Sequence, residues 1–175
     1  MITSRFLHRI KQFRQAVLPT GKDVAIAALQ PYLNPSQIVL FRRMHPSEQA
    51  HALKVLEQLQ AAGHAEPELM TAALLHDVGK ILSPLSICER VLIVLGQSFF
   101  PRAAERLSQG GPRGLRHAFV VAAHHAEWGA DLAAQTGATA RTVDLISRHQ
   151  ELLSGPPRSR TEHLLAALQN ADNST

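Results

Sequence analysis

The chain has 175 residues with a formal net charge of +4, and 45% of them are hydrophobic, which predicts one globular domain with a substantial core. Cys88 is the only cysteine, which excludes an internal disulfide and a four-thiolate zinc site and favours a cytoplasmic location. No apolar stretch approaches the roughly 20 residues of a membrane-spanning helix, so we expect no integral span, and the first residues lack the apolar core of a secretory leader.

The N-terminal segment, residues 1–22, has five basic residues and no acidic one, whereas the rest of the chain has 13 basic and 14 acidic residues. Its apolar residues recur at helical spacing, at Ile2, Phe6, Ile10, Phe13 and Val17. We expect this basic amphipathic helix to pack on its own domain; contact with nucleic acid or an anionic membrane is the less favoured alternative. Residues 1–43 are interpreted as this helix and a helical lead-in, and residues 44–175 as the main domain.

Proline and glycine divide the chain into segments of helical length, and no segment alternates as a strand would. Pro67 suits the first position of a helix, Gly63 and Gly137 suit helix ends, and Ser159 with Glu162 has the spacing of a capping box. The expected helices cover residues 4–17, 22–31, 36–43, 47–62, 67–79, 85–97, 100–109, 115–123, 126–136, 139–152 and 160–171. The sequence therefore predicts an all-α fold, a compact bundle of many helices.

The dipeptide His76-Asp77 follows the apolar run 69–75, inside the predicted helix 67–79. Burying an unpaired carboxylate is costly, and a metal ion would give Asp77 a counter-charge and His76 a bond. Lys80 comes three residues after Asp77, so on a continued helix it would project to the same side. There it would either neutralise a substrate phosphate or serve as an ordinary cation at a helix C-terminus, and both interpretations stay open.

Four other ionisable residues lie on the apolar faces of separate predicted helices, namely His51, His125, His149 and Asp172. A single such histidine is usually a satisfied core residue, but helical bundles build metal sites from inward side chains on several helices. Imidazoles and carboxylates suit one or two divalent ions among Mn, Fe, Ni, Co, Zn and Mg. The remaining histidines His8, His64, His117 and His163 are interpreted as surface or core residues. The arginines at 90, 102, 106, 113 and 116 are interpreted as a solvated helix face, with phosphate binding as the alternative.

Five segments of the chain resemble the HD superfamily of metal-dependent phosphohydrolases. The central one, residues 72–80, reads Ala-Ala-Leu-Leu-His-Asp-Val-Gly-Lys, and the others are residues 47–56, 125–130, 145–150 and 168–172. The resemblance runs from about Met44 to Asp172. The Gly-Tyr-Pro signature of the cyclic di-nucleotide phosphodiesterase branch is missing, which disfavours that substrate.

The resemblance implies a ligand set and a catalytic group. One metal would be held by His51, His76, Asp77 and Asp172, and a second by His125 and His149 with Asp77 shared. Lys80 would contact the substrate phosphate.

Three details of this set stay open. His124 adjoins His125 and either could be the ligand, although the spacing to the following Gly-Ala favours His125. His45 is a weaker alternative to His51. Asp172 is followed by only three residues, and a frayed end would leave it unsecured.

We therefore predict a metal-dependent phosphohydrolase, with Asp77 and Lys80 at its catalytic centre. Its substrate would be a phosphate monoester or diester, nucleotide-like or another small phosphorylated molecule, attacked by a metal-bound water. The alternative is a catalytically silent module that binds a metal or nucleotide and acts in signalling. A purely structural metal is less favoured, because such sites are closed and four-coordinate.

Overall fold

The computed structural model describes residues 26–175. Every regular element in this range is a helix, which confirms the all-α class. The elements are α2 (Ile26–Leu29), α3 (Pro35–Arg42), α4 (Pro46–Ala61), α5 (Pro67–Leu75), the 3-10 helix η1 (Val78–Leu82), α6 (Ile87–Phe99), α7 (Pro101–Ser108), α8 (Arg116–Gln135), α9 (Ala140–Arg148) and α10 (Arg160–Ser174). The predicted helix 4–17 and the first part of the predicted helix 22–31 lie outside the described residues.

Helix starts follow signals that the sequence carries. Ser159 and Glu162 form the predicted capping box of α10, and Pro67 is the first residue of α5. Gly63 and Gly137 follow the ends of α4 and α8 with φ of +87° and +79°, a left-handed conformation that a side chain would strain. Local chemistry therefore accounts for these four boundaries.

The predicted helix 67–79 is wrong in one respect, since α5 ends at Leu75 and the chain tightens into η1 after His76 and Asp77. The cause is the close approach of α8. A Cβ at Gly79 would lie 2.0 Å from the carbonyl oxygen of His125 and 2.6 Å from the amide nitrogen of Gly129. The chain can pass α8 there only with a glycine and a tight turn.

Two other predicted boundaries are also wrong. The break expected between residues 123 and 126 does not occur, because α8 runs unbroken from Arg116 to Gln135 and contains His125 in its interior. The helix expected to reach residue 152 stops at Arg148, and His149 is its C-terminal cap.

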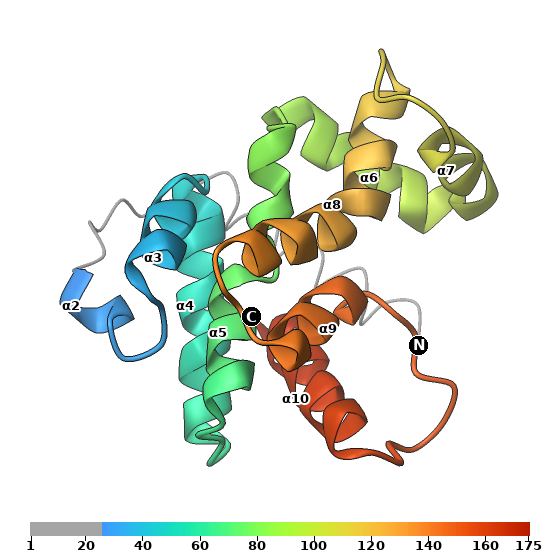
Figure 1. The fold of residues 1–175 in the computed structure, drawn as a ribbon. Coiled ribbons are helices and arrows are strands. Elements are labelled where there is room, and N and C mark those ends of the chain that lie inside the picture. Colours follow the sequence, from blue (N-terminus) through green and yellow to red (C-terminus); the bar gives the residue numbers. More distant parts are fainter. Residues whose placement is uncertain (1–25) are drawn as a thin grey trace.

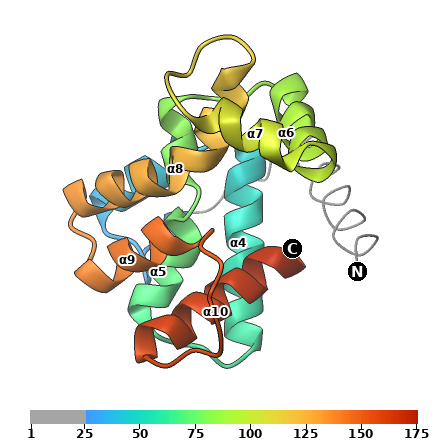
Figure 2. The same ribbon diagram turned by 90° about the vertical axis from the view of Figure 1, so that its right-hand side faces the viewer.

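The core of the molecule surrounds α5, whose residues from Leu69 to Leu75 are all buried. Helices α4, α9 and α10 pack against α5, and Phe41 of α3 belongs to the same core. Figures 1 and 2 show α4 and α5 side by side with α10 across them. His76 and Asp77 therefore follow directly after the most deeply buried helix.

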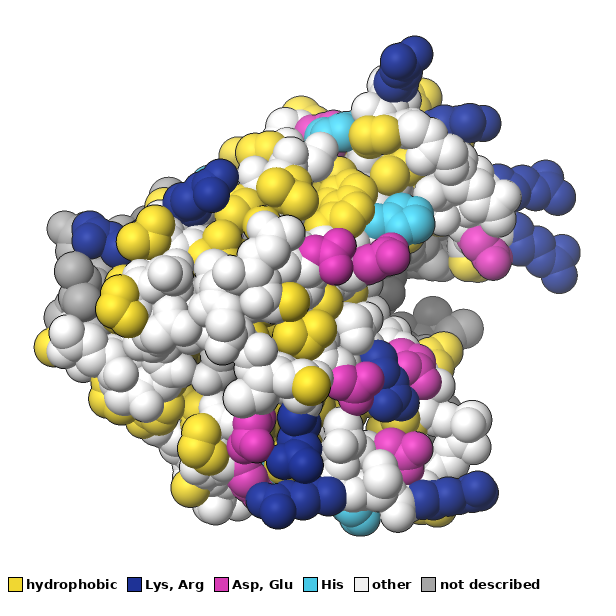
Figure 3. All heavy atoms as spheres, viewed as in Figure 1, with side chains coloured by type: hydrophobic (Ala, Val, Ile, Leu, Met, Phe, Trp, Pro, Cys, Tyr) yellow, Lys and Arg dark blue, Asp and Glu magenta, His cyan; other side chains and the backbone are white. Residues whose placement is uncertain are grey.

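The opposite end of the molecule is built differently. Helix α6 has no buried residue and α7 has one, Ala104. Both lie near the start of α8, where Gly96 of α6 allows close contact with the ring of Phe119. Figure 3 shows basic side chains gathered along this end, and Arg102 and Arg106 of α7 are exposed. Within residues 26–175, no helix combines the length and apolarity needed to span a membrane.

Candidate metal centre

The core helices bring the six predicted ligands together from distant parts of the chain. His51 lies on α4, His76 and Asp77 join α5 to η1, His125 lies on α8, His149 caps α9, and Asp172 lies in the last turn of α10. They form two groups, one of His51, His76 and Asp172 and one of Asp77, His125 and His149. Within each group the candidate ligand atoms lie within 4.8 Å of one another.

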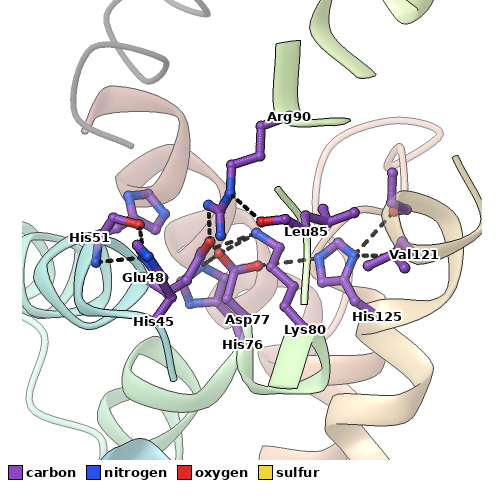
Figure 4. Close-up of polar contacts among 12 residues, drawn as sticks. His45, Glu48, His51, His76, Asp77, Lys80, Leu85, Arg90, Val121 and His125 are labelled. Atoms are coloured by element: carbon purple, nitrogen blue, oxygen red, sulfur yellow. Dashed lines mark hydrogen bonds and ion pairs between the residues drawn. The ribbon is translucent and has the colours of Figure 1, made fainter. Parts of the chain in front are cut away.

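Asp77 stands between the two groups. Its Oδ1 lies 3.2 Å from Nε2 of His125 and 3.9 Å from Nε2 of His149, whereas its Oδ2 lies 3.7 Å from Nε2 of His76. Nε2 of His76 is in turn 3.7 Å from Oδ1 of Asp172. One carboxylate therefore faces both groups with different oxygens, the arrangement required of a ligand shared by two ions. Figure 4 shows Asp77 between His76 and His125.

Backbone hydrogen bonds orient three of the imidazoles. Nδ1 of His76 donates to the carbonyl of Ala73 at 2.9 Å, and Nδ1 of His149 donates to that of Ile146 at 2.8 Å. Nδ1 of His125 donates to the carbonyl of Val121 at 3.0 Å. Because a carbonyl only accepts, each Nδ1 carries a proton, and in the neutral ring Nε2 then offers a lone pair. Metal-ligating histidines are commonly oriented in this way.

Two of these Nε2 atoms, those of His76 and His125, make no hydrogen bond with the described residues, although carboxylate oxygens lie 3.2–3.7 Å away. Both atoms are buried, and a buried polar atom without a hydrogen bond is rare in proteins because it loses its hydration without replacement. A divalent cation between the imidazoles and carboxylates would satisfy both atoms. The residues present therefore fit a metal site.

The charge states also suit metal ligands. Burial alone would raise the pKa of Asp77, but the charge of Lys80 and the adjacent imidazoles of His76 and His125 hold it well below its usual range. Burial likewise opposes ionisation of Asp172, whereas the hydrogen bond from His51 and nearby imidazole charge lower its pKa to about 2. Burial, with the neighbouring imidazoles of His76 and His125, lowers the pKa of His149 to about 3. Near neutral pH both carboxylates are ionised and His149 is neutral, as metal binding requires.

The end of α10 is tied to α4 through His51. Nε2 of His51 is 2.7 Å from Oδ1 of Asp172, and Nδ1 of His51 is 3.0 Å from Oγ1 of the buried Thr175. Burial lowers the pKa of His51, but the hydrogen bond to Asp172 and the charges of Asp77 and Asp172 outweigh it and raise the pKa above its usual value. Asp172 lies within α10, which continues to Ser174, and its carboxylate contacts His51.

Lys80 lies beside Asp77, but on a 3-10 helix and not on the continued α-helix that the sequence predicted. It lies on η1, where residues three apart eclipse one another, and its Nζ is 2.7 Å from Oδ2 of Asp77. The same Nζ is 3.3 Å from Oε2 of Glu48. Burial lowers the pKa of Lys80, but the charges of Asp77 and Glu48 outweigh it and raise the pKa above its usual value. Lys80 is therefore a permanent cation beside the candidate metal ligands.

Glu48 and Arg90 were not predicted as site residues. Glu48 is buried, and its Oε1 accepts a hydrogen bond from Nη1 of Arg90. The signal for Glu48 was its position three residues before His51 on one helix, which places both on one side. The pairing with Arg90 crosses 42 residues of sequence, and no local pattern encodes it. The interpretation of Arg90 as part of a solvated face does not agree with this contact.

Other histidines occupy distinct places. The side chain of His124 is 44% exposed, stacks on Trp128 and lies 3.6 Å from Glu127, so the structure brings His125 and not His124 into the centre. His45 caps the start of α4, with its Nδ1 3.3 Å from the amide nitrogen of Ser47. His117 bonds to Ser83 at 2.6 Å and to Glu89, contacts that the sequence did not indicate.

Comparison with known proteins gives one result. A family model described as HD domain matches residues 49–174, a range that contains all six clustered residues and Lys80. No curated protein and no solved structure shows significant similarity to the chain.

Proposed function

The chain belongs to the HD domain family, and from that premise we propose that it is a metal-dependent phosphohydrolase acting on a phosphate monoester or diester. The observation that carries the proposal is Asp77, an ionised carboxylate that faces two groups of imidazoles, each of which has a buried Nε2 without a hydrogen bond. A structural ion would need one closed set of ligands, whereas this centre offers two adjacent sets.

The proposed ligands divide as the geometry divides them. One divalent ion would be held by His51, His76 and Asp172. The other would be held by His125 and His149, and Asp77 would be shared by the two ions. When bound, such ions supply a hydroxide-like water near neutral pH and an electrostatic hold on phosphoryl oxygens. The backbone hydrogen bonds to the Nδ1 atoms would maintain the ring orientation throughout.

Lys80 is proposed to bind the substrate phosphate. Its ammonium already donates to Asp77 and Glu48, which leaves one N–H for a phosphoryl oxygen. Its raised pKa keeps it charged through the working pH range. A cation held by two carboxylates does not need to reorganise as negative charge develops on the phosphate, and this lowers the cost of the transition state.

The test is hydrolysis of p-nitrophenyl phosphate and of small nucleotides by protein loaded with Mn, Fe, Ni or Zn. We expect activity in the wild type and in His163→Ala, a control on the exposed face of α10, and its loss in His76→Ala and Asp77→Ala with helicity unchanged by circular dichroism. Retained activity in both centre variants would contradict the proposal. Tight binding without turnover in the loaded wild type would instead favour the silent signalling module.

A further inference from the structure

A buried carboxylate joins two cations at the edge of the candidate metal centre. Glu48 accepts from Nζ of Lys80 on η1 and from Nη1 of Arg90 in the first turn of α6. Figure 4 shows Lys80 and Arg90 converging on Glu48 beside Asp77. We call Glu48, Lys80 and Arg90 the cation clamp.

The contacts of the cation clamp leave hydrogen-bond donors unused. Besides its contact with Glu48, Arg90 donates from Nε to the carbonyl of Leu85 at 3.4 Å, and these two bonds occupy only part of its guanidinium. Nη2 of Arg90 and one N–H of Lys80 have no partner among residues 26–175. The side chain of Glu48 is 7% exposed, whereas those of Lys80 and Arg90 are 24% and 17% exposed. The Glu48 carboxylate is thus buried, whereas Lys80 and Arg90 keep N–H donors that a ligand can reach.

The first turn of α6 is held in place on two sides. Arg90 binds Glu48 of α4, and the adjacent Glu89 binds His117 of α8 and the cap residue Ser86. Helix α6 buries no residue, so these polar contacts rather than core packing position Arg90. A guanidinium oriented before the ligand arrives loses less entropy on binding it.

We propose that Arg90, positioned by Glu48, binds the substrate phosphate together with Lys80 and makes the site selective for phosphomonoesters over diesters. The proposal rests on the function proposed above. Arginine offers a planar pair of donors that matches two oxygens of one phosphate, which a lysine ammonium does not. Glu48 is a positioning residue, because it would act on the substrate only by holding Lys80 and Arg90 in place.

The selectivity follows from charge. Lys80 pairs with two carboxylates, Asp77 and Glu48, whereas Glu48 is the one carboxylate that pairs with Arg90 among the described residues, so the charge of Arg90 is the less compensated of the two. A phosphomonoester is a dianion near neutral pH with three non-bridging oxygens, whereas a diester is a monoanion with two. Arg90 can pair with the additional charge and the third oxygen of a monoester. A diester has neither, so it gains less from Arg90.

The experiment compares Arg90→Ala with Arg106→Ala, the matched removal of an exposed arginine on α7 that makes no ion pair with the described residues. KM is measured for p-nitrophenyl phosphate and for bis(p-nitrophenyl) phosphate on Mn-loaded protein, and inorganic phosphate binding is measured calorimetrically on metal-free protein. In Arg90→Ala we expect the monoester KM to rise and the phosphate affinity to fall by roughly tenfold or more. The diester KM should change by less than about threefold, and Arg106→Ala should match the wild type in all three.

A second set of variants tests whether the role of Arg90 is purely structural. Arg90→Ala leaves the buried Glu48 with Lys80 alone, so its thermal midpoint is expected to fall. The double variant Arg90→Ala/Glu48→Gln removes the unpaired charge and should recover the midpoint while phosphate affinity stays low. Arg90→Lys should recover part of the affinity. Recovery of both the midpoint and the phosphate affinity in the double variant would overturn the proposal.

Failure of the proposed function and failure of the cation clamp are distinguishable. If the loaded wild type hydrolyses neither ester, the proposed phosphohydrolase activity is contradicted. Phosphate binding by the metal-free protein then tests the proposed role of Arg90 independently. Equal phosphate affinities in wild type and Arg90→Ala would overturn the proposed role of Arg90, even if the enzyme is active. An equal rise of KM for monoester and diester would also overturn it.

Discussion

The candidate metal centre and the α6 end of the molecule are built on different physical principles. The ligands of the centre lie on helices whose apolar residues form the core, so their mutual placement follows from helix packing. Arg90 lies on a helix without buried residues and is positioned by ion pairs. The metal ligands are thus positioned by apolar packing, whereas Arg90 is positioned by a buried carboxylate and a few polar contacts. Four experiments test this difference between the two regions.

The largest effect is expected from Asp77→Ala. This change removes the one carboxylate that faces both groups of imidazoles and also the partner of Lys80. Hydrolysis of p-nitrophenyl phosphate should fall by roughly a hundredfold or more, because both proposed ions lose a shared ligand. Steady-state kinetics at saturating metal measures it. Activity within threefold of the wild type would remove Asp77 from the catalytic centre.

Gly79→Ala tests the packing that places the centre. An added Cβ would meet the carbonyl oxygen of His125 at 2.0 Å and the amide nitrogen of Gly129 at 2.6 Å, so η1 and α8 must separate. We expect a loss of about 1–3 kcal/mol in the free energy of unfolding, measured with urea. Gly111→Ala is the control, because nothing lies within 4 Å of a Cβ there. Equal stabilities of the two variants would show that this close approach is not required.

The pH dependence of the metal-free protein tests the burial of His149. Its pKa is lowered from 6.5 to about 3, so between these values the unfolded chain binds a proton that the folded chain does not. The contribution of His149 to stability is fully present above pH 6.5 and is lost as the pH falls toward 3. This dependence is worth at most about 1.4 kcal/mol per pH unit. His149→Gln should unfold with a weaker acid dependence than the wild type, and an unchanged slope between pH 6 and 4 would contradict the account.

The smallest effect is expected from His117→Ala at the α6 end. It removes the imidazole that links Ser83 and Glu89, at a cost of about 1 kcal/mol in the free energy of unfolding. The metal content should not change, because no candidate ligand contacts His117. If His117→Ala lowered the metal content, the two regions would not be independent.

The sequence predicts those helix starts and ends that depend on residues close together in the chain. The capping box at Ser159, the proline at the start of α5 and the glycines after α4 and α8 each act within a few residues. The six residues of the metal centre were predicted because their spacing with core residues, together with the family motifs, identifies inward positions. Their assignment as ligands stays a prediction.

What the sequence could not provide depends on contacts between distant segments. The break after Leu75 results from the approach of α8 to Gly79, and the apolar run alone favoured a longer helix. The pairing of Glu48 with Arg90 depends on where α6 docks, which no periodicity records. The sequence predicted two helices, 115–123 and 126–136, whereas the structure has one helix, α8, that contains His125.

The most direct test of the central claim is a count of bound metal. Protein purified without chelators or a metal-binding tag, loaded with Mn, Fe, Ni or Zn and then freed of unbound ions, is analysed by mass spectrometry of the metals. The account predicts about two ions per chain in the wild type, about one in His125→Ala and a marked loss in Asp77→Ala. No bound metal in the wild type after loading, or the same content in all three proteins, would contradict it.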